Sequence, residues 1–371
     1  MEFARISLVA TVCILVCCAA GARLGYNRSW VTDACSTREG GEGTCINVRN
    51  CTALLKFISA NSLPYDQYKS IISKFICNLE NQQVCCPFKV PDVIASNTVV
   101  DHSQHSNYKL LPTNCGSSIT IQKIINGNET SLFEFPWAVA LQHKGDARWG
   151  CGGTLLSNRY ILTAAHCIRP SNMLQLNKVR LGEHNFKTNP DCEDSGFGTT
   201  CADPPQDFDV SIDDAIVHPE YDSRTYKNDI ALIRLRKSAQ ISDSVSPICL
   251  PITVDEQTFD FKNFTVIGWG GTENSFHSSI LLKVRVPKVN NSVCAPRYAG
   301  LGALTSKQMC AGGKDEQDSC AGDSGGPLMA DYTKDRRFRT LQYGIVSSGP
   351  SICGFEQFPT LYTRVDKYVG W

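Results

Sequence analysis

Cysteine usage constrains this chain more than any other feature of its sequence. The 371 residues include nineteen cysteines. Three of them, Cys13, Cys17 and Cys18, lie in a largely apolar run over residues 6–20, which leaves sixteen for the rest of the chain. An even number of cysteines in an oxidising compartment is typical of disulfides, so we expect eight disulfides and no free thiol. Zinc is the alternative explanation, but the sequence has neither a C-x-x-C pair nor an H-E-x-x-H motif.

The apolar run indicates an export signal. It follows Arg5 and precedes the small-x-small triplet Ala20-Gly21-Ala22, as the apolar part of a cleavable signal peptide does. The run is shorter than the roughly 20 residues that a membrane span needs, and no later apolar stretch is longer. We therefore expect residues 1–22 to be removed from a soluble, secreted chain. Five N-x-S/T sequons are compatible with export and glycosylation, at Asn27, Asn50, Asn128, Asn263 and Asn290.

The charge balance argues against two classes of partner. Lys plus Arg number 36 and Asp plus Glu number 36, so the formal net charge is zero. A neutral chain has no overall field that attracts nucleic acid or an anionic membrane, and we expect neither partner.

The remaining cysteines separate a small amino-terminal segment from a larger remainder. Six of them fall within residues 35–86, which are followed directly by Pro87 in the sequence CCP. So small a segment buries little apolar surface and needs covalent staples. Six cysteines allow fifteen connectivities, and spacing alone does not choose among them. Residues 87–123 are rich in Pro, Ser, Asn and His and predict a linker that holds one cysteine, Cys115.

The rest of the chain, residues 124–371, predicts an all-β fold. Its apolar runs are short, are separated by Gly, Pro, Asn and Asp, and show no long amphipathic helix, a pattern typical of a β-sandwich or barrel. The expected strands are Trp137–Gln142, Gly153–Ser157, Tyr160–Thr163, Lys178–Leu181, Ala215–Val217, Ile230–Leu235, Thr265–Gly268, Leu281–Val286, Pro327–Met329, Leu341–Val346 and Thr360–Val365.

Three short motifs in this region indicate nucleophilic chemistry. Ser324 lies in GDSGGP, His166 in TAAHC and Asp229 in DIAL. A serine hydroxyl becomes a useful nucleophile only beside a base that is itself oriented by a third group. GDSGG alone is equally compatible with an ordinary turn, because Gly, Asp and Ser are common turn residues. The three motifs occur together in the order His, Asp, Ser, and coincidence is a poor explanation for that combination.

These motifs together resemble the chymotrypsin- and trypsin-like S1 family of serine proteases, whose order of triad residues differs from that of subtilisins and α/β-hydrolases. The six-cysteine segment with its CCP end resembles the clip domain of arthropod proteases. The alternative for that segment is any small disulfide-rich secreted module. The resemblance implies two antiparallel six-stranded β-barrels over residues 124–371, with the triad in the cleft between them, preceded by a small disulfide-rich clip domain over residues 35–86.

The resemblance also implies roles for individual residues. His166 acts as general base and acid, Asp229 orients its imidazole, and Ser324 attacks the peptide carbonyl. The backbone amides of Gly322 and Ser324 form the oxyanion hole.

Activation and specificity residues are carried over in the same way. Cleavage after Lys123 would free the amino group of Ile124, which pairs with Asp323. A carboxylate at Asp318, at the base of the primary specificity pocket, selects Arg or Lys. Ser347 and Gly349 would line the wall of that pocket, with Ser348 between them where an aromatic residue is common. Thr360 stands where glycine is usual and would narrow the neck of the pocket.

The disulfide pairs implied by the resemblance are Cys35 with Cys85, Cys45 with Cys77, Cys51 with Cys86, Cys115 with Cys249, Cys151 with Cys167, Cys192 with Cys201, Cys294 with Cys310, and Cys320 with Cys353. Catalysis requires no cofactor. A structural calcium ion is expected in the loop over residues 183–191, with ligands from Glu183, Asn185, Thr188 and Asp191. The alternative is a solvated acidic loop held by the Cys192 and Cys201 pair.

The implied function is that of a secreted trypsin-like endopeptidase zymogen in an extracellular cascade of innate immunity, melanization or Toll-type signalling. Its partners would be protein substrates such as zymogens or a cytokine precursor, an upstream trypsin-like activating protease and a serpin inhibitor. The alternative is a catalytically silent homologue that acts by binding and assembly. Such homologues usually have a replaced triad residue, and all three are present here. Family members usually continue beyond the position of Trp371 into a terminal helix, so we expect reduced stability.

Overall fold

The computed structural model describes two separate units of the chain. One covers Met1–Lys56 and Ser70–Val90, and the other covers Phe57–Lys69 and Pro91–Trp371. Within the described residues, no helix is both long and apolar enough to cross a membrane. The described residues are 34–36, 42–47, 50–51, 54, 75–78, 83–87, 99–118, 129–146, 149–168, 175–194, 198–271, 275, 277–313, 322–335, 337–349 and 358–371.

The amino-terminal unit contains a small antiparallel sheet. Its strands are β1 (Ala34–Ser36), β2 (Glu42–Asn47), β3 (Ile76–Asn78) and β4 (Gln83–Pro87), in the order β1-β2-β4-β3. Among its described residues the buried apolar side chains are few, such as Leu54, Phe75 and Val84, so the covalent links contribute much of its stability. The disulfides are Cys35–Cys85, Cys45–Cys77 and Cys51–Cys86, as the resemblance implied.

Part of the predicted linker is built into the larger unit. Cys115 forms a disulfide with Cys249. The Gly116 amide donates to the carbonyl of Pro247 at 2.8 Å, and the Gly116 carbonyl accepts from the Thr340 amide at 2.9 Å. Gly116 has φ +64°, and a Cβ there would lie 2.3 Å from the Thr340 carbonyl oxygen, so the close approach requires glycine. Residues 99–118 also include the 3-10 helix η2 (Ser106–Leu110).

The first part of the larger unit is a seven-stranded antiparallel sheet. Its order is β11-β8-β5-β6-β7-β13-β12. Apolar residues of these strands pack together with Trp137, just before β5, into one core that includes Leu141, Leu155, Ile161 and Ile233. The strands are β5 (Ala138–His143), β6 (Trp149–Ser157), β7 (Tyr160–Thr163), β8 (Leu176–Leu181), β11 (Gln206–Asp209), β12 (Ala215–Val217) and β13 (Ala231–Arg234).

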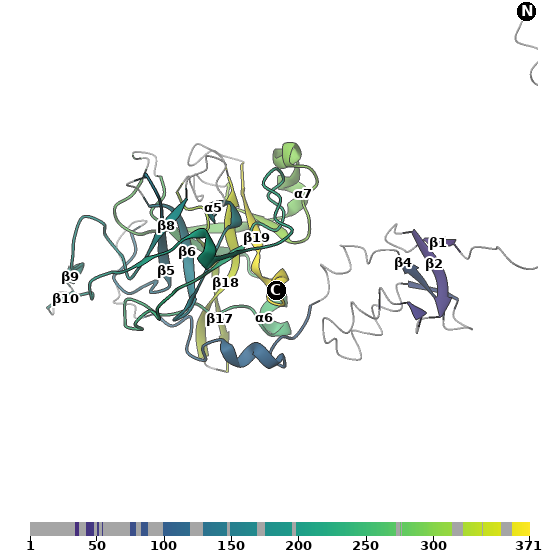
Figure 1. Ribbon diagram of the computed structural model, residues 1–371, viewed down its shortest axis with the longest axis horizontal. Coiled ribbons are helices and arrows are strands. Elements are labelled where there is room, and N and C mark those ends of the chain that lie inside the picture. The colour runs from purple at the N-terminus through teal and green to yellow at the C-terminus, as the bar shows by residue number, and fades with distance from the viewer. Residues whose placement is uncertain are drawn as a thin grey trace, which may run out of the picture. The chain divides into compact units, whose positions relative to one another are not determined.

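The second part is a closed barrel of six strands in the order β14-β15-β16-β19-β18-β17. In Figure 1 its yellow strands β17, β18 and β19 lie beside the teal strands of the first sheet. Its interior holds Val266, Leu328, Leu341 and Tyr362. The strands are β14 (Asn263–Gly268), β15 (Leu282–Val289), β16 (Gln308–Ala311), β17 (Pro327–Lys334), β18 (Arg337–Ser348) and β19 (Thr360–Arg364).

The all-β expectation is confirmed, with one difference in the first half. The second barrel closes with six strands, whereas the first sheet has seven and its edge strands β11 and β12 do not pair with each other. Between these strands the chain turns into the 3-10 helix η3 (Ile212–Asp214), where the Ser211 amide donates to Asp214 Oδ2 at 2.9 Å.

Short elements that the apolar pattern did not predict complete the larger unit. Cys192 and Cys201 pair directly across the hairpin of β9 and β10 and form a disulfide, and Cys294–Cys310 joins α7 to β16. These elements are β9 (Cys192–Asp194), β10 (Thr199–Cys201), α5 (Ala165–Ile168), α6 (Val254–Thr258), α7 (Asn291–Cys294), η4 (Ala295–Leu301) and η5 (Val365–Lys367).

Candidate active site

His166 and Asp229 form a close pair. His166 lies in α5, immediately after β7, and Asp229 lies just before β13, the strand paired with β7. The His166 amide donates to Asp229 Oδ1 at 2.9 Å, and His166 Nδ1 lies 2.8 Å from Asp229 Oδ2. Because an ionised carboxylate only accepts hydrogen bonds, Nδ1 carries the proton and Nε2 is the ring nitrogen with a lone pair.

Asp229 is completely buried, and the barrel supplies donors to it. The Ser347 hydroxyl, at the end of β18, donates to Asp229 Oδ2 at 2.6 Å. The Thr363 hydroxyl in β19 donates to the Asp229 carbonyl at 2.8 Å. A buried carboxylate stays charged only when such donors replace water. The pair is therefore held by both halves of the larger unit.

The charge of Asp229 controls the protonation of His166. Burial lowers the pKa of His166, but the negative charge of Asp229 and its hydrogen bond raise it by more, so the net shift is upward from the ordinary value of 6.5. An imidazole with a raised pKa is a stronger base than a free histidine.

Ser324 lies on a sharp turn that needs glycines. Gly322 and Gly325 have φ values of +101° and +80°, in the left-handed region. The turn is closed by the Gly326 amide, which donates to the Asp323 carbonyl at 2.8 Å, and the Gly325 amide donates to the Val346 carbonyl at 2.9 Å. The turn is thus attached to β18, and Ser324 stays half-exposed.

Contacts of the Cys151–Cys167 disulfide bring this turn to His166. The Cys167 sulfur lies 3.7 Å from His166 Nε2 and 3.5 Å from the Ser324 carbonyl oxygen. The Gly152 amide donates to the same carbonyl at 2.7 Å. Within the described part of the chain, the amides of Gly322 and Ser324 donate to no backbone carbonyl.

Asp323 lies in a space that two glycines provide. Its Oδ1 accepts from the Gly270 amide at 2.9 Å. A Cβ at Gly268 or Gly270 would come within 2.1 Å or 2.5 Å of that oxygen, so any larger residue would displace the carboxylate. The predicted partner Ile124, and Lys123 before it, lie outside the described residues.

The predicted specificity residues are described only in part. Asp318 lies outside the described residues, as do Cys320 and Cys353 of the eighth expected disulfide. Gly349 and Thr360 are brought together, because a Cβ at Gly349 would lie 2.9 Å from Thr360 Oγ1.

Two aromatic residues beside the site were not found from the sequence. The Tyr226 ring packs edge-on against the His166 imidazole, with centroids 5.8 Å apart. The Tyr298 hydroxyl lies 2.7 Å from the Pro359 carbonyl oxygen and 3.1 Å from that of Ser348. It therefore links the segments that carry Thr360 and Gly349. No local motif marks either tyrosine.

The described residues contain one group of three potential metal ligands, Cys151, His166 and Cys167. Its two cysteines are joined in a disulfide and have no thiolate to offer, so the group is not a metal site. Of the sequons, Asn50, Asn263 and Asn290 are exposed, and Asn27 and Asn128 lie outside the described residues.

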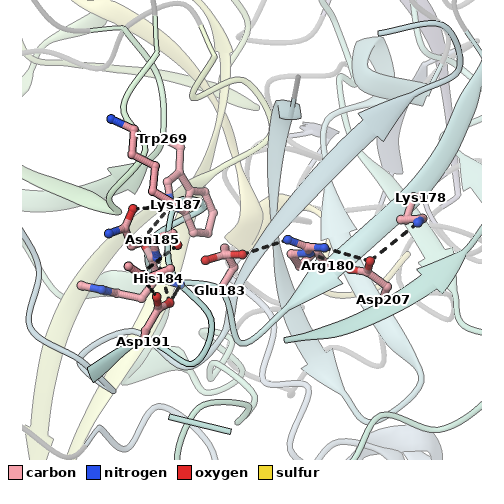
Figure 2. Close-up of polar contacts among 10 residues, drawn as sticks. Lys178, Arg180, Glu183, His184, Asn185, Lys187, Asp191, Asp207 and Trp269 are labelled. Carbon is pink, nitrogen blue, oxygen red and sulfur yellow. Dashed lines mark hydrogen bonds and ion pairs between the residues drawn. The ribbon is translucent and has the colours of Figure 1, made fainter. Parts of the chain in front are cut away.

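The loop expected to bind calcium has a compact structure of its own (Figure 2). Glu183 and Asp191 are each 5% exposed. Burial raises the pKa of Glu183 to about 7, although the hydrogen bond from Arg180 opposes the shift. Calcium binding by Glu183, Asn185, Thr188 and Asp191 stays a prediction.

Comparisons with known proteins agree with this arrangement. A family model described as Trypsin matches residues 124–371, and one described as Regulatory CLIP domain of proteinases matches residues 35–86. Serine protease grass of Drosophila melanogaster is 36% identical, over 93% of this chain and 91% of its own length. Melanization protease 1 of Drosophila melanogaster is 37% identical, over 91% of each chain. The crystal structure of the drosophila Grass clip serine protease of Toll pathway is similar with a TM-score of 0.64 and 35% identity, over 92% of this chain and 96% of that one.

Proposed function

This chain belongs to the trypsin family of serine proteases and carries a clip domain, and we propose that it is a secreted endopeptidase made as an inactive zymogen. The observation that carries the proposal is the pairing of His166 with the buried Asp229 beside the glycine turn of Ser324. A complete set of nucleophile, base and orienting carboxylate favours an active enzyme over a silent homologue.

The geometry supports acyl transfer through Ser324. His166 Nε2 takes the hydroxyl proton as Ser324 attacks the peptide carbonyl, and then gives it to the leaving amine. Asp229 holds the ring and stabilises the imidazolium. The amides of Gly322 and Ser324 donate to the oxyanion, and one such donor lowers the barrier by about 3 kcal/mol.

Activation would follow a cut after Lys123. The new amino group of Ile124 would pair with Asp323, and this pairing would fix the adjoining turn that carries the oxyanion amides. The two-glycine space around the Asp323 carboxylate supports this role, because it holds that side chain in one place. Before the cut, an incompletely formed oxyanion hole would keep the enzyme nearly inactive.

The substrate would be cut after Arg or Lys, with Asp318 as the selecting charge. Thr360 is 1% exposed and lies beside Gly349, which supports a narrow pocket. A planar guanidinium pairs with a carboxylate through two hydrogen bonds, whereas an ammonium offers a single point of charge. We therefore propose a preference for Arg.

The relatives suggest a cascade role in extracellular fluid. One has melanization in its name, and the similar crystal structure is of a protease of the Toll pathway. The proposed substrates are protein zymogens or a cytokine precursor, with an upstream trypsin-like activator and a serpin as inhibitor.

The proposal is tested by incubating the activated protein with candidate haemolymph zymogens and sequencing the new amino termini. We expect cleavage after Arg by the wild-type protein and none by the Ser324→Ala variant. If neither protein cleaves any substrate or an arginyl ester after complete activation, the silent homologue is the better description.

A further inference from the structure

The loop over residues 183–191 contains two buried carboxylates that need compensation. Glu183 and Asp191 are each 5% exposed. A buried charge is tolerated only with hydrogen bonds or an opposite charge. A calcium ion could supply that charge, but calcium takes about six to eight oxygen ligands.

Asp191 is surrounded by hydrogen-bond donors from its own loop. Its Oδ2 accepts from the amides of His184 at 3.1 Å and Asn185 at 2.9 Å. Its Oδ1 accepts from the hydroxyl of Thr188. The loop is therefore folded around an anion, with N–H and O–H groups directed toward its centre. Such groups repel a metal cation.

The carboxylate of Glu183 pairs with the guanidinium of Arg180, a residue of the preceding strand β8. Arg180 Nη1 donates to Glu183 Oε2 at 3.0 Å. Asp207 lies directly opposite Arg180 in the pairing of β11 with β8, and it accepts from Nε at 2.6 Å and Nη2 at 2.9 Å. Figure 2 shows the guanidinium between the two carboxylates, with Lys178 on the far side of Asp207. This bidentate pair fixes the orientation of Arg180.

The same guanidinium also packs on an aromatic stack that reaches the loop. Arg180 Cζ lies 4.9 Å from the centroid of the Trp149 ring, a cation–π distance. Trp149 stacks on Phe186, a residue of the loop, with centroids 5.6 Å apart and planes 6° apart. Phe186 in turn contacts Trp269 of the barrel at 5.3 Å. Arg180 thus supports the loop through Glu183 and through Phe186.

The two Asn185 oxygens, which are candidate calcium ligands, already accept hydrogen bonds. The Asn185 carbonyl accepts from the Thr188 amide at 3.0 Å, and Asn185 Oδ1 accepts from the Lys187 amide at 3.1 Å. Among the side-chain oxygens of the four expected ligands, as far as the structure describes their surroundings, Glu183 Oε1 alone lacks a hydrogen-bond partner. In this arrangement the residues do not fit a calcium ion.

We propose that the Arg180 guanidinium is the cation around which residues 183–191 fold, so that the loop takes its folded form without a metal ion. Calcium binding by the same loop is the competing account. A chelator should leave the melting temperature unchanged under this proposal and should lower it if calcium holds the loop.

The test is thermal unfolding of full-length protein that carries Ser324→Ala, which prevents self-digestion. The melting temperature should be the same in millimolar calcium and in chelator. Adding Arg180→Gln should lower it by roughly 5 to 10 °C in both conditions, because Glu183 and Asp207 both lose the guanidinium that pairs with them. Adding Glu183→Gln to that variant should recover part of the loss, because a buried amide costs less than a buried carboxyl group that has lost its partner.

Arg224→Gln is the matched control. Arg224 is an exposed arginine whose carboxylate partner, Asp222, lies 3.7 Å away, so its loss should change the melting temperature by less than about 1 °C. Two results would overturn the proposal. One is a wild-type melting temperature that rises by more than about 2 °C with calcium. The other is an Arg180→Gln variant that melts like the control.

Discussion

The hydroxyl of Ser347 offers a sharp test of how Asp229 is held. It donates to Asp229 Oδ2 at 2.6 Å, next to the bond from His166 Nδ1, and both Ser347 and Asp229 are buried. A hydrogen bond to a charged group contributes about 1.5–3 kcal/mol. Ser347→Ala leaves two His166 bonds to the carboxylate, so we expect the lower part of that range. We expect about 1.4 kcal/mol of this loss to fall on the transition state, in which Asp229 must hold the imidazolium in place, and 1.36 kcal/mol is a factor of ten in rate, so kcat/KM should fall by roughly tenfold.

The pH profile separates positioning from a general loss of structure. In the wild-type protein, kcat/KM should rise with pH through a His166 pKa above 6.5, because only the neutral imidazole accepts the serine proton. Without the Ser347 hydroxyl, Asp229 is less stabilised as an anion and attracts the imidazolium more strongly. The pKa of His166 should therefore rise further, and the acid limb should move to higher pH.

The assay is steady-state hydrolysis of an arginyl peptide between about pH 5 and 9, with melting temperatures measured in parallel. Ser348→Ala is the matched control, because it changes the next residue along the same strand, whose carbonyl rather than hydroxyl contacts Tyr298. The reasoning would be refuted if the Ser347→Ala enzyme kept the acid limb of the wild-type pH profile and its kcat/KM changed by less than twofold. Equal effects in both variants would refute it as well.

Three further predictions concern the proposed protease. Ser324→Ala should abolish hydrolysis of an arginyl ester while leaving the melting temperature and zymogen cleavage unchanged; residual activity above a small fraction would contradict the triad. Amino-terminal sequencing of active material should start at Ile124, and denatured chains should separate only after reduction of Cys115–Cys249; another start, or separation without reductant, would count against this activation. Matched Arg and Lys substrates should show higher kcat/KM for Arg because of Asp318, and equal values would argue against the narrow pocket.

Local motifs predicted the backbone turn at Ser324 because its geometry requires particular residue types. The turn at Ser324 needs glycine at 322 and 325, where φ is positive, and both are visible in GDSGGP. The seven disulfides among described residues match the implied pairs, since family spacing carries that information. Short apolar runs, such as β7 and β12, were found at their observed bounds.

The parts that sequence did not predict depend on partners distant in the chain. Ser347 and Asp229 are 118 residues apart, and nothing in the sequence around Ser347 indicates that its hydroxyl binds Asp229. The strand β11 is short and polar, with the sequence QDFD, so the apolar pattern does not predict it. Arg180 is one of many surface-type cations in the sequence. Its place between Glu183 and Asp207 follows from the register of β8 with β11.

The stack of Trp149, Phe186 and Trp269 gives this protein an internal optical reporter. Phe186 belongs to the 183–191 loop and lies between two indoles, one from the first sheet and one from the barrel. The Trp269 indole also donates to the His184 carbonyl at 3.2 Å. If the loop withdraws, both indoles lose an aromatic neighbour and gain water, and their emission shifts to longer wavelength. Release of the loop can therefore be followed by intrinsic fluorescence, without a label and apart from unfolding of the whole domain.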